Sequence, residues 1–417
     1  MRNLNKNLKK NVPFVLGAIV LSITVFLFNG RKNSNLQEAS NVNVDVSCQQ
    51  NEDIMKNVEM RAVWIPFMSL SVKGECSKEK FESKYLELLE NAKRHKMNAV
   101  IVHVRPYSDA LYPSKIFPWS HILTGTQGND PGFNPLEYMV KTTHDYGMEF
   151  HAWINPFRVK VNGTPNEISK NSPAYKWLNA PQEQNSDIIM KWGEDLYYNP
   201  AYEEVRNIII DGVKEIVENY DVDGIHFDDY FYPKDEPDID SYSYNKYLKS
   251  VTKEASPLDL QRWRMDNVNL LVSGVYNAVK SIKPRVKFGI SPGGNLKNVK
   301  EVSADVETWG RDKGYVDYLC PQIYFSMEHP ILPFKQAADE WRNVVKNESV
   351  NLYLGMGVYK AGTEVDEGTW KGCSDILKKQ VEYCRGIRYN GFMLYSIDSL
   401  EMPNAKDEVE NVMKVLN

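Results

Sequence analysis

The chain has 417 residues, of which 42% are hydrophobic and 25% are charged, which is ordinary for a globular protein. Its net charge of −5 and the lack of a basic stripe in the body of the chain exclude a typical nucleic-acid-binding protein, so no nucleic-acid partner is expected. The length exceeds one typical domain but suits a single α/β barrel with insertions.

The N-terminus has the pattern of an export segment. Arg2, Lys6, Lys9 and Lys10 precede an apolar run at 12–28, as a basic region precedes the apolar region of a targeting signal. The run is intermediate in length between a signal peptide and a membrane-spanning helix, and no convincing cleavage site follows it. We expect a signal peptide or membrane anchor at 1–29, with the anchor favoured, and an exported protein in the cell envelope, either anchored or secreted. The excess of basic residues before the run predicts that the body faces outward.

Two further segments follow. Residues 30–58 are rich in Asn, Ser, Gln and Glu and poor in aromatic residues, which predicts a flexible linker. From Met60 onward, short runs typical of β-strands alternate with longer segments of helical period. The third predicted segment is therefore a folded domain at 59–417. Its expected strands are 60–65, 99–104, 148–154, 224–227, 286–291, 318–324, 351–357 and 391–397.

Helices are predicted between these strands. The segment 78–96 places apolar residues on one face. Asn134, Pro135 and Glu137 form a capping arrangement, and Asn199-Pro200 repeats it before the next helical segment. Further helices are expected at 258–282, 303–313, 334–346, 372–387 and 404–416.

Eight β-then-α units predict a (β/α)8 TIM barrel. The runner-up is a doubly wound open sheet, which would usually carry a glycine-rich phosphate loop after its first strand, and none is present. The segments after the second, third and fourth strands are long, at 105–133, 155–198 and 228–257. In a barrel these are βα loops on the C-terminal face, where active sites lie.

The stretch "DVDGIHFDDYFYP" at 221–233 places two adjacent carboxyl groups at the end of the fourth strand. Successive side chains of a strand point to opposite faces. If Ile225 and Phe227 face the helices, His226 and Asp228 face the barrel axis. Asp229 would face outward unless the strand has already ended. We therefore favour Asp228 as a catalytic group, with Asp229 as its helper or as a loop anchor.

This chemistry is typical of glycoside hydrolysis, which needs two carboxyl groups, or one and a substrate acetamido group, around the scissile bond. One carboxyl must stay protonated, and Asp228 and Asp229 could raise each other's pKa as like charges. A second carboxyl from another strand end is expected, the candidates being Asp109, Asp398, Glu328 and Glu364. The predicted catalytic set is Asp228, Asp229 and Asp109.

Other polar and aromatic residues at strand ends are predicted to bind substrate. They are Arg105, Tyr107, Trp153, Asn155, Arg158, His226, Gln322, Tyr324 and Asp398. The two arginines could bind carboxylates, including those of the substrate, or could form ion pairs at the barrel mouth.

The histidines raise the alternative of a metal site. His103, His151 and His226 all lie on predicted strands, but the first strand lacks the paired histidines of a binuclear metal barrel. Neither a metal nor another cofactor is expected.

Several stretches together resemble the bacterial glycosyl-hydrolase-like family ten, which is related to divisome-associated peptidoglycan glycosidases. They lie at 59–66, 102–114, 131–158, 196–233, 316–325 and 352–360, in family order. The resemblance implies a (β/α)8 barrel that hydrolyses an extracytoplasmic polysaccharide, with peptidoglycan strands as the leading substrate. It carries across the strand-end positions Arg105, Asp109, Asn155, Arg158, Asp228, Asp229, Gln322 and Tyr324.

A more distant likeness is to family 18 chitinases, whose fourth strand reads DGxDxDxE. Here "DGIHFDDY" keeps Asp223 and Asp228 but has His226 at the middle acid and Tyr230 in place of the catalytic Glu. Asp228 or Asp229 would have to act as the acid, and Tyr324 is analogous to the tyrosine that positions an acetamido group. The missing Glu supports an alternative function, a glycan-binding barrel that does not cleave its ligand and is tethered to the membrane.

Overall fold

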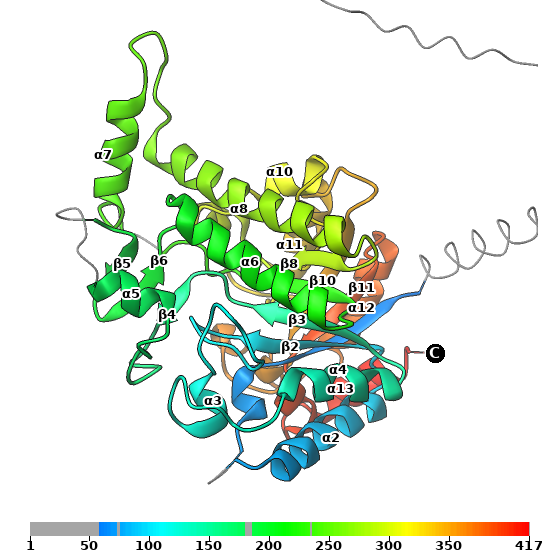
Figure 1. The fold of residues 1–417 in the computed structure, drawn as a ribbon. Coiled ribbons are helices and arrows are strands. Elements are labelled where there is room, and N and C mark those ends of the chain that lie inside the picture. Colours follow the sequence, from blue (N-terminus) through cyan, green and yellow to red (C-terminus); the bar gives the residue numbers. More distant parts are fainter. Residues whose placement is uncertain (1–57, 73–75, 180–185, 234–235, 417) are drawn as a thin grey trace, which may run out of the picture. The chain divides into compact units, whose positions relative to one another are not determined.

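The computed structural model describes residues 58–72, 76–179, 186–233 and 236–416. The predicted export segment at 1–29, and the predicted linker up to residue 57, lie outside the described residues. The unit Glu59–Asn417 contains a closed barrel in which eight parallel strands follow the order β1-β11-β10-β9-β8-β7-β3-β2 (Figure 1). The predicted TIM barrel is thereby confirmed, and the open-sheet alternative is excluded because β1 pairs with both β2 and β11.

The barrel strands agree closely with the expected runs, except for the sixth. Its ladder stops at Leu319, because Pro321 has no N–H to donate to a neighbouring strand. Beyond that point Gln322 makes only isolated bridges to Gly293 and Gly355. The strands are β1 (Met60–Ile65), β2 (Ala99–Arg105), β3 (Glu149–Ile154), β7 (Gly224–Phe227), β8 (Lys287–Ile290), β9 (Tyr318–Leu319), β10 (Asn351–Gly357) and β11 (Gly391–Tyr395).

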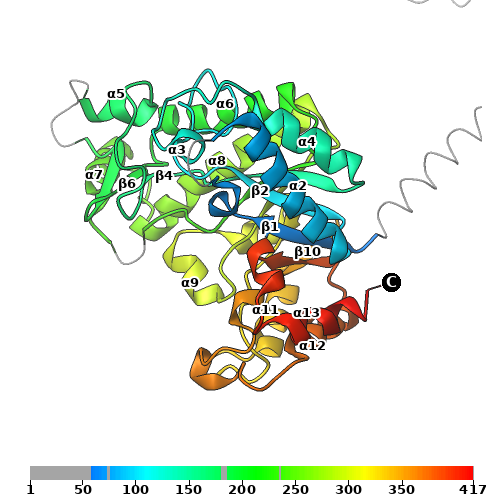
Figure 2. The ribbon, with the colours of Figure 1, turned by 90° about the horizontal axis from the view of Figure 1, so that it is seen from below.

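Helices follow each strand and cover the outside of the barrel (Figures 1 and 2). These covering helices are α2 (Lys78–Arg94), α4 (Pro135–Asp145), α6 (Glu203–Asn219), α8 (Leu260–Ile282), α10 (Val306–Arg311), α11 (Phe334–Val344), α12 (Ile376–Gly386) and α13 (Lys406–Met413). Shorter helices lie in the βα loops: α3 (His121–Thr124), α5 (Pro173–Asn179), α7 (Ser241–Ser250) and α9 (Leu296–Glu301). Among the described helices, none is long and apolar enough to cross a membrane.

One predicted helix start is confirmed and one is wrong. Asn134 caps α4, since its side chain accepts a hydrogen bond from the Glu137 N–H. By contrast, α6 begins only at Glu203. The Asn199 side chain instead accepts from the Ala201 N–H at 2.9 Å and closes a local turn, so the chain needs two more residues before the helix starts.

The barrel strands alternate between two apolar layers, as pleating requires. Side chains that point outward, such as Ile225 and Phe227, pack with the helices in the larger core. A smaller cluster fills the barrel interior, and its members are Met60, Ala62, Trp64, Ala99, Ile101, Trp153, Tyr318, Cys320, Tyr353 and Met393. His226 lies in this interior layer and contacts Trp64 and Tyr318, which confirms the predicted inward direction.

The long connection after β3 builds a small antiparallel sheet of its own. It has the order β4-β6-β5, formed by β4 (Arg158–Lys160), β5 (Ile189–Trp192) and β6 (Asp195–Tyr198). Figures 1 and 2 both place this sheet with α5 and α7 on one side of the barrel. Arg158 begins β4 and pairs with Tyr197 of β6, so the sheet fixes the backbone of one predicted site residue.

Candidate active site

Asp228 is the first residue beyond β7, and its side chain is 2% exposed. Trp153 Nε1 donates to its Oδ2 at 3.0 Å, and Asn155 Nδ2 lies 2.9 and 3.1 Å from its two oxygens. Burial raises the pKa of Asp228, against the opposing charge of Arg158 and these two hydrogen bonds. The carboxyl group is therefore fixed in orientation by β3 and by the loop that follows it.

Asp229 lies after the strand has ended, so its side chain does not follow the pleat outward. Its Oδ2 lies 3.8 Å from the position that a Cβ on Gly293 would take, at the end of β8. Burial, and then the charge of Asp228, raise the pKa of Asp229 to about 7, while a hydrogen bond with Gln322 acts to lower it. A carboxyl group with this pKa can hold a proton near neutral pH and release it, as a general acid must.

Four tyrosines form a group at the barrel mouth, and three of them, Tyr230, Tyr324 and Tyr395, are close enough to the carboxyl pair for its charge to act on their pKa. Tyr324 and Tyr395 stack with ring centroids 5.9 Å apart, and Tyr359 meets each of them edge-on at 6.1 Å. Tyr230 is the fourth member, because it lies close enough to raise the pKa of both Tyr359 and Tyr395. Tyr230 and Tyr359 are 46% and 40% exposed, so apolar ring surface with hydroxyl tips is open to a ligand, as sugar binding requires.

Arg158 reaches into the same site from the start of β4. Its guanidinium carbon lies 3.4 Å from the centroid of the Tyr230 ring. Burial acts to lower the pKa of Arg158, but Asp228, Tyr230 and Tyr107 together outweigh it and the pKa is raised. The Asn155 side-chain oxygen accepts the Arg158 N–H at 2.8 Å, so the amide that holds Asp228 also holds the turn that positions Arg158.

Arg105 and Asp109 lie behind the site and are 1% and 0% exposed. The Arg105 guanidinium lies over the Phe117 ring, and both Asp109 and Asp228 act on its pKa, which burial lowers. Asp109 Oδ2 accepts from His121 Nδ1 at 3.1 Å and Gln127 Nε2 at 3.2 Å. The structure therefore places Asp109 beneath the loop after β2 rather than at an open cleft.

The remaining predicted residues are divided between the mouth and other places. Trp153 and Asn155 hold Asp228, and Tyr324 stands in the tyrosine group. Gln322 donates to the Ser291 backbone oxygen at 2.9 Å, next to Asp229.

The other predicted residues lie away from the carboxyl pair. Tyr107 is 6% exposed, and its ring packs against Phe67 and His121. Asp398 is exposed and accepts a hydrogen bond from the Ser69 hydroxyl, while Glu328 and Glu364 are exposed loop residues.

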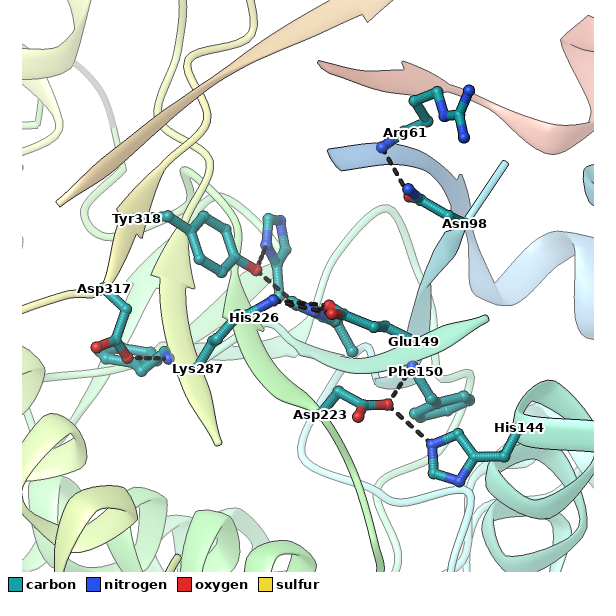
Figure 3. Close-up of polar contacts among 12 residues, drawn as sticks. Arg61, Asn98, His144, Glu149, Phe150, Asp223, His226, Lys287, Asp317 and Tyr318 are labelled. Atoms are coloured by element: carbon teal, nitrogen blue, oxygen red, sulfur yellow. Dashed lines mark hydrogen bonds and ion pairs between the residues drawn. The ribbon is translucent and has the colours of Figure 1, made fainter. Parts of the chain in front are cut away.

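His226 is fully buried inside the barrel, where both ring nitrogens have partners. Trp64 Nε1 can only donate, so His226 Nε2 must accept and Nδ1–H donates to the Tyr318 hydroxyl at 2.9 Å. Tyr318 then donates to His151 Nδ1 at 3.0 Å, and His151 Nε2–H donates to Glu149, which pairs with Lys287 (Figure 3). Burial lowers the pKa of His226 well below its usual value, which fits the neutral ring that this chain requires.

The histidines do not gather as metal ligands. His103 stacks on Trp153 with centroids 3.7 Å apart, whereas His151 and His226 are joined through Tyr318. Within the described ranges, no group of three His, Cys, Asp or Glu side chains is arranged to hold a metal ion.

Sequence reasoning did not select three of the four tyrosines as site residues. Tyr395 carried a usable signal, because it lies two residues after the inward-facing Met393 on β11 and therefore shares its direction. Tyr230 and Tyr359 lie beyond the ends of their strands, where loop paths decide which side chains meet.

Adjacent carboxyl groups with raised pKa values, set among tyrosines at the mouth of a parallel barrel, define the chemistry of a glycoside hydrolase. Residues 59–371 match the family described as "Glycosyl hydrolase-like 10". The chain belongs to this family, which confirms the resemblance seen in the sequence, and it is a glycoside hydrolase.

Curated relatives carry the same description. The chain is 37% identical to "Glycosyl hydrolase YngK" of Bacillus subtilis over 79% of its own length and 67% of the relative. It is 32% identical to "Glycosyl hydrolase DigH" of Escherichia coli K12 over 87% of each protein.

Solved structures of low sequence identity share the fold. The PgaB (BpsB) glycoside hydrolase domain from Bordetella bronchiseptica is 14% identical, with a TM-score of 0.55 over 86% of this chain and 100% of that domain. Alpha-L-fucosidase isoenzyme 2 from Paenibacillus thiaminolyticus is 12% identical, with a TM-score of 0.53, and the chain spans 49% of it.

Proposed function

We propose that the protein cleaves the glycan strands of peptidoglycan outside the cytoplasm, with Asp229 as general acid and Asp228 as its charged partner. The observation that carries the proposal is the adjacent carboxyl pair beyond β7, in which Trp153 and Asn155 hold Asp228. Burial and the charge of Asp228 raise the pKa of Asp229 to about 7, in keeping with an acid role. The choice of glycan rests on the resemblance to peptidoglycan glycosidases, and the location on the basic and apolar pattern at 1–29.

The proposed reaction uses the acetamido group of the substrate as its nucleophile. Adjacent carboxyl groups cannot stand on opposite faces of a sugar ring. Asp109 is buried, and Asp398 is bound to the Ser69 hydroxyl, so neither supplies the second carboxyl group. Asp229 gives its proton to the leaving glycosidic oxygen as the bond to C1 breaks, and the acetamido oxygen bonds to C1. Asp228 accepts the acetamido N–H and stabilises the positive charge, and Tyr324 orients the group.

The second step restores the enzyme. Water attacks C1, the bond to the acetamido oxygen breaks, and ionised Asp229 takes the proton of the water. The product keeps the anomeric configuration of the substrate. Glycans whose amino sugars lack the acetyl group are therefore not cleaved in this way.

Carboxyl-to-amide variants test the assignment. Asp228→Asn and Asp229→Asn should each lower the release of soluble fragments from purified peptidoglycan strands at least 100-fold, the usual contribution of a general acid or its partner. Asp211→Asn is the matched control, because Asp211 is a half-exposed residue of α6 that pairs with Lys214. Full activity in Asp229→Asn would refute the role of this residue. Binding without any product in the unmodified protein would favour a glycan-binding barrel.

A further inference from the structure

We propose that Arg158 forms a carboxylate-binding subsite beside Asp228, so that a sugar at the scissile bond carries a carboxylate. This inference rests on the proposed function, because it assumes that a glycan is cleaved at the Asp228–Asp229 pair. It adds a chemical requirement on the substrate and names the residue that imposes it.

The first observation is that Arg158 is a half-buried cation with no ion-pair partner among the described residues. Its Nε atom is buried and has no hydrogen-bond partner. Arg264 is paired, since it donates to Asp240 from Nε at 2.9 Å and also donates to two backbone carbonyls. The buried Arg105, behind the same site, resembles Arg158 in having nitrogens without a hydrogen-bond partner. Leaving such donors unpaired costs free energy, so the site is built to receive an acceptor.

The second observation is the order of the charges with depth. The two most deeply buried carboxyl groups of this corner, Asp228 and Asp109, are 2% and 0% exposed, and the cation Arg105 is 1% exposed. Arg158 lies in the half-buried layer above them, which it shares with the carboxyl groups of Asp229 and Asp195. A ligand that enters the mouth at this corner therefore meets Arg158 before it reaches Asp228.

The third observation is the neutral wall around the guanidinium. Arg158 acts on the pKa of Tyr107, Tyr197, Tyr230 and Tyr395, all of which are raised by burial. Four un-ionised phenols add no negative charge to that of Asp228 and can donate further hydrogen bonds to an anion. A planar carboxylate matches the guanidinium fork in a bidentate way.

The fourth observation is position and rigidity. The Arg158 guanidinium lies over the ring of Tyr230, two residues after Asp228, and its charge acts on the pKa of Asp228, Asp229 and Tyr395. Its backbone is held by Asn155 and by pairing with Tyr197. A carboxylate bound here belongs to a sugar that touches the reacting carboxyl pair, and it meets a preorganised partner.

Two kinds of sugar bring this chemistry. One is a hexuronic acid, with the carboxylate on C6, and the other is an amino sugar with a lactyl ether on C3, as in peptidoglycan strands. Both place a planar anion beside the ring, and the two differ in where it lies.

The experiment compares the same glycan with and without its charge. Peptidoglycan strands freed of peptides are chemically reduced so that each lactyl carboxylate becomes an alcohol, and kcat/KM is measured on both forms. The unmodified enzyme should lose roughly 10- to 100-fold on the reduced strands, as expected for a lost charge-assisted hydrogen-bond pair. A hexuronate-containing glycan and chitin oligosaccharides, which lack carboxylates, serve as further arms.

Variants assign the preference to the residue. Arg158→Gln should cleave intact and reduced strands at the same low rate, and Arg158→Lys should keep part of the preference. Arg285→Gln, which changes an exposed arginine, should keep the full preference. Equal cleavage of both forms by the unmodified enzyme overturns the subsite, as does an equal loss on both forms in Arg158→Gln.

The outcomes separate the two proposals. Rapid cleavage of chitin oligosaccharides would leave glycan hydrolysis standing and remove the carboxylate requirement. If no glycan is cleaved, the proposed function fails. Calorimetric binding of intact and reduced strands to Asp229→Asn then still tests the subsite, because equal affinity would overturn it.

Discussion

Replacing Asp229 by Asn should inactivate the enzyme and at the same time stabilise the fold at alkaline pH. The pKa of this carboxyl is about 7 in the folded protein and near its reference value of 3.8 when unfolded. The folded state then binds the extra proton between these two values, so stability falls as pH rises from about 4 to about 7. Above about pH 7 the unmodified protein therefore remains less stable by this full amount.

The magnitude follows from the shift of about three pKa units. At roughly 1.4 kcal/mol per unit, ionising Asp229 costs about 4 kcal/mol, and some relaxation of the site reduces this to about 2–4 kcal/mol. Asn carries no charge, so the variant should gain that amount at pH 8.5 and only about 1 kcal/mol at pH 4.5. Many active sites show this exchange of stability for activity.

Thermal and urea unfolding of both proteins at pH 4.5 and pH 8.5 measure the difference. Asp211→Asn, at the surface of α6, is the control and should show little change at either pH. The reasoning is refuted if Asp229→Asn is less stable than the unmodified protein at pH 8.5. It is also refuted if the gain is the same at both pH values, since a packing effect would not depend on ionisation.

Other expected outcomes follow from the same geometry. The kcat/KM of the unmodified enzyme should fall about tenfold per pH unit above pH 7, as Asp229 loses its proton, and a flat profile to pH 9 would contradict an acid role. In Asp228→Asn the residual kcat/KM should begin to fall at a lower pH, because the charge that helps to raise the pKa of Asp229 is gone. An unchanged pH profile would show that burial alone raises this pKa. Asn155→Ala should lower kcat more than 10-fold, and unchanged kinetics would show that Asp228 needs no such support. Tyr318→Phe should lower the free energy of unfolding by about 2–4 kcal/mol, because two buried histidine nitrogens lose their hydrogen-bond partner. Its effect on KM should be small. Protease added to spheroplasts, whose cytoplasmic membrane is intact, should digest the barrel if 1–29 exports it, and protection would place the barrel inside that membrane.

The sequence was sufficient to predict the barrel, because its strand runs are short, β-rich and regularly separated by helical segments. It also gave the direction of Asp228 and His226 through the pleat. It did not give their depth. His226 lies two residues before Asp228, and at about 3.3 Å per residue this moves it from the mouth into the packed interior. The strand pattern shows that His226 faces the barrel axis, but it does not show how deep in the barrel the residue lies. A prediction of substrate contact from this pattern therefore includes a histidine that is fully buried.

Loop paths limited the prediction of the site in the same way. Asp109 follows β2 closely, but the chain turns back so that Ala110 pairs with Trp119, and Gln127 closes over the carboxyl group. Tyr230 and Tyr359 reach the mouth from two different loops. No local pattern encodes contacts between segments so far apart, so strand-end reasoning selected both acids of the candidate site but only one of its four tyrosines.

Asn155 joins recognition to chemistry through one planar group. Its nitrogen binds both oxygens of Asp228, and its oxygen binds the N–H groups of Phe157 and Arg158. The two ends of an amide cannot turn independently, so a ligand that pulls Arg158 rotates the support of the carboxyl group as well. A substrate that binds tightly to Arg158 would therefore align the carboxyl pair for reaction, and one that binds weakly would leave the pair misaligned. Selectivity would then show itself as a change in turnover as well as in binding.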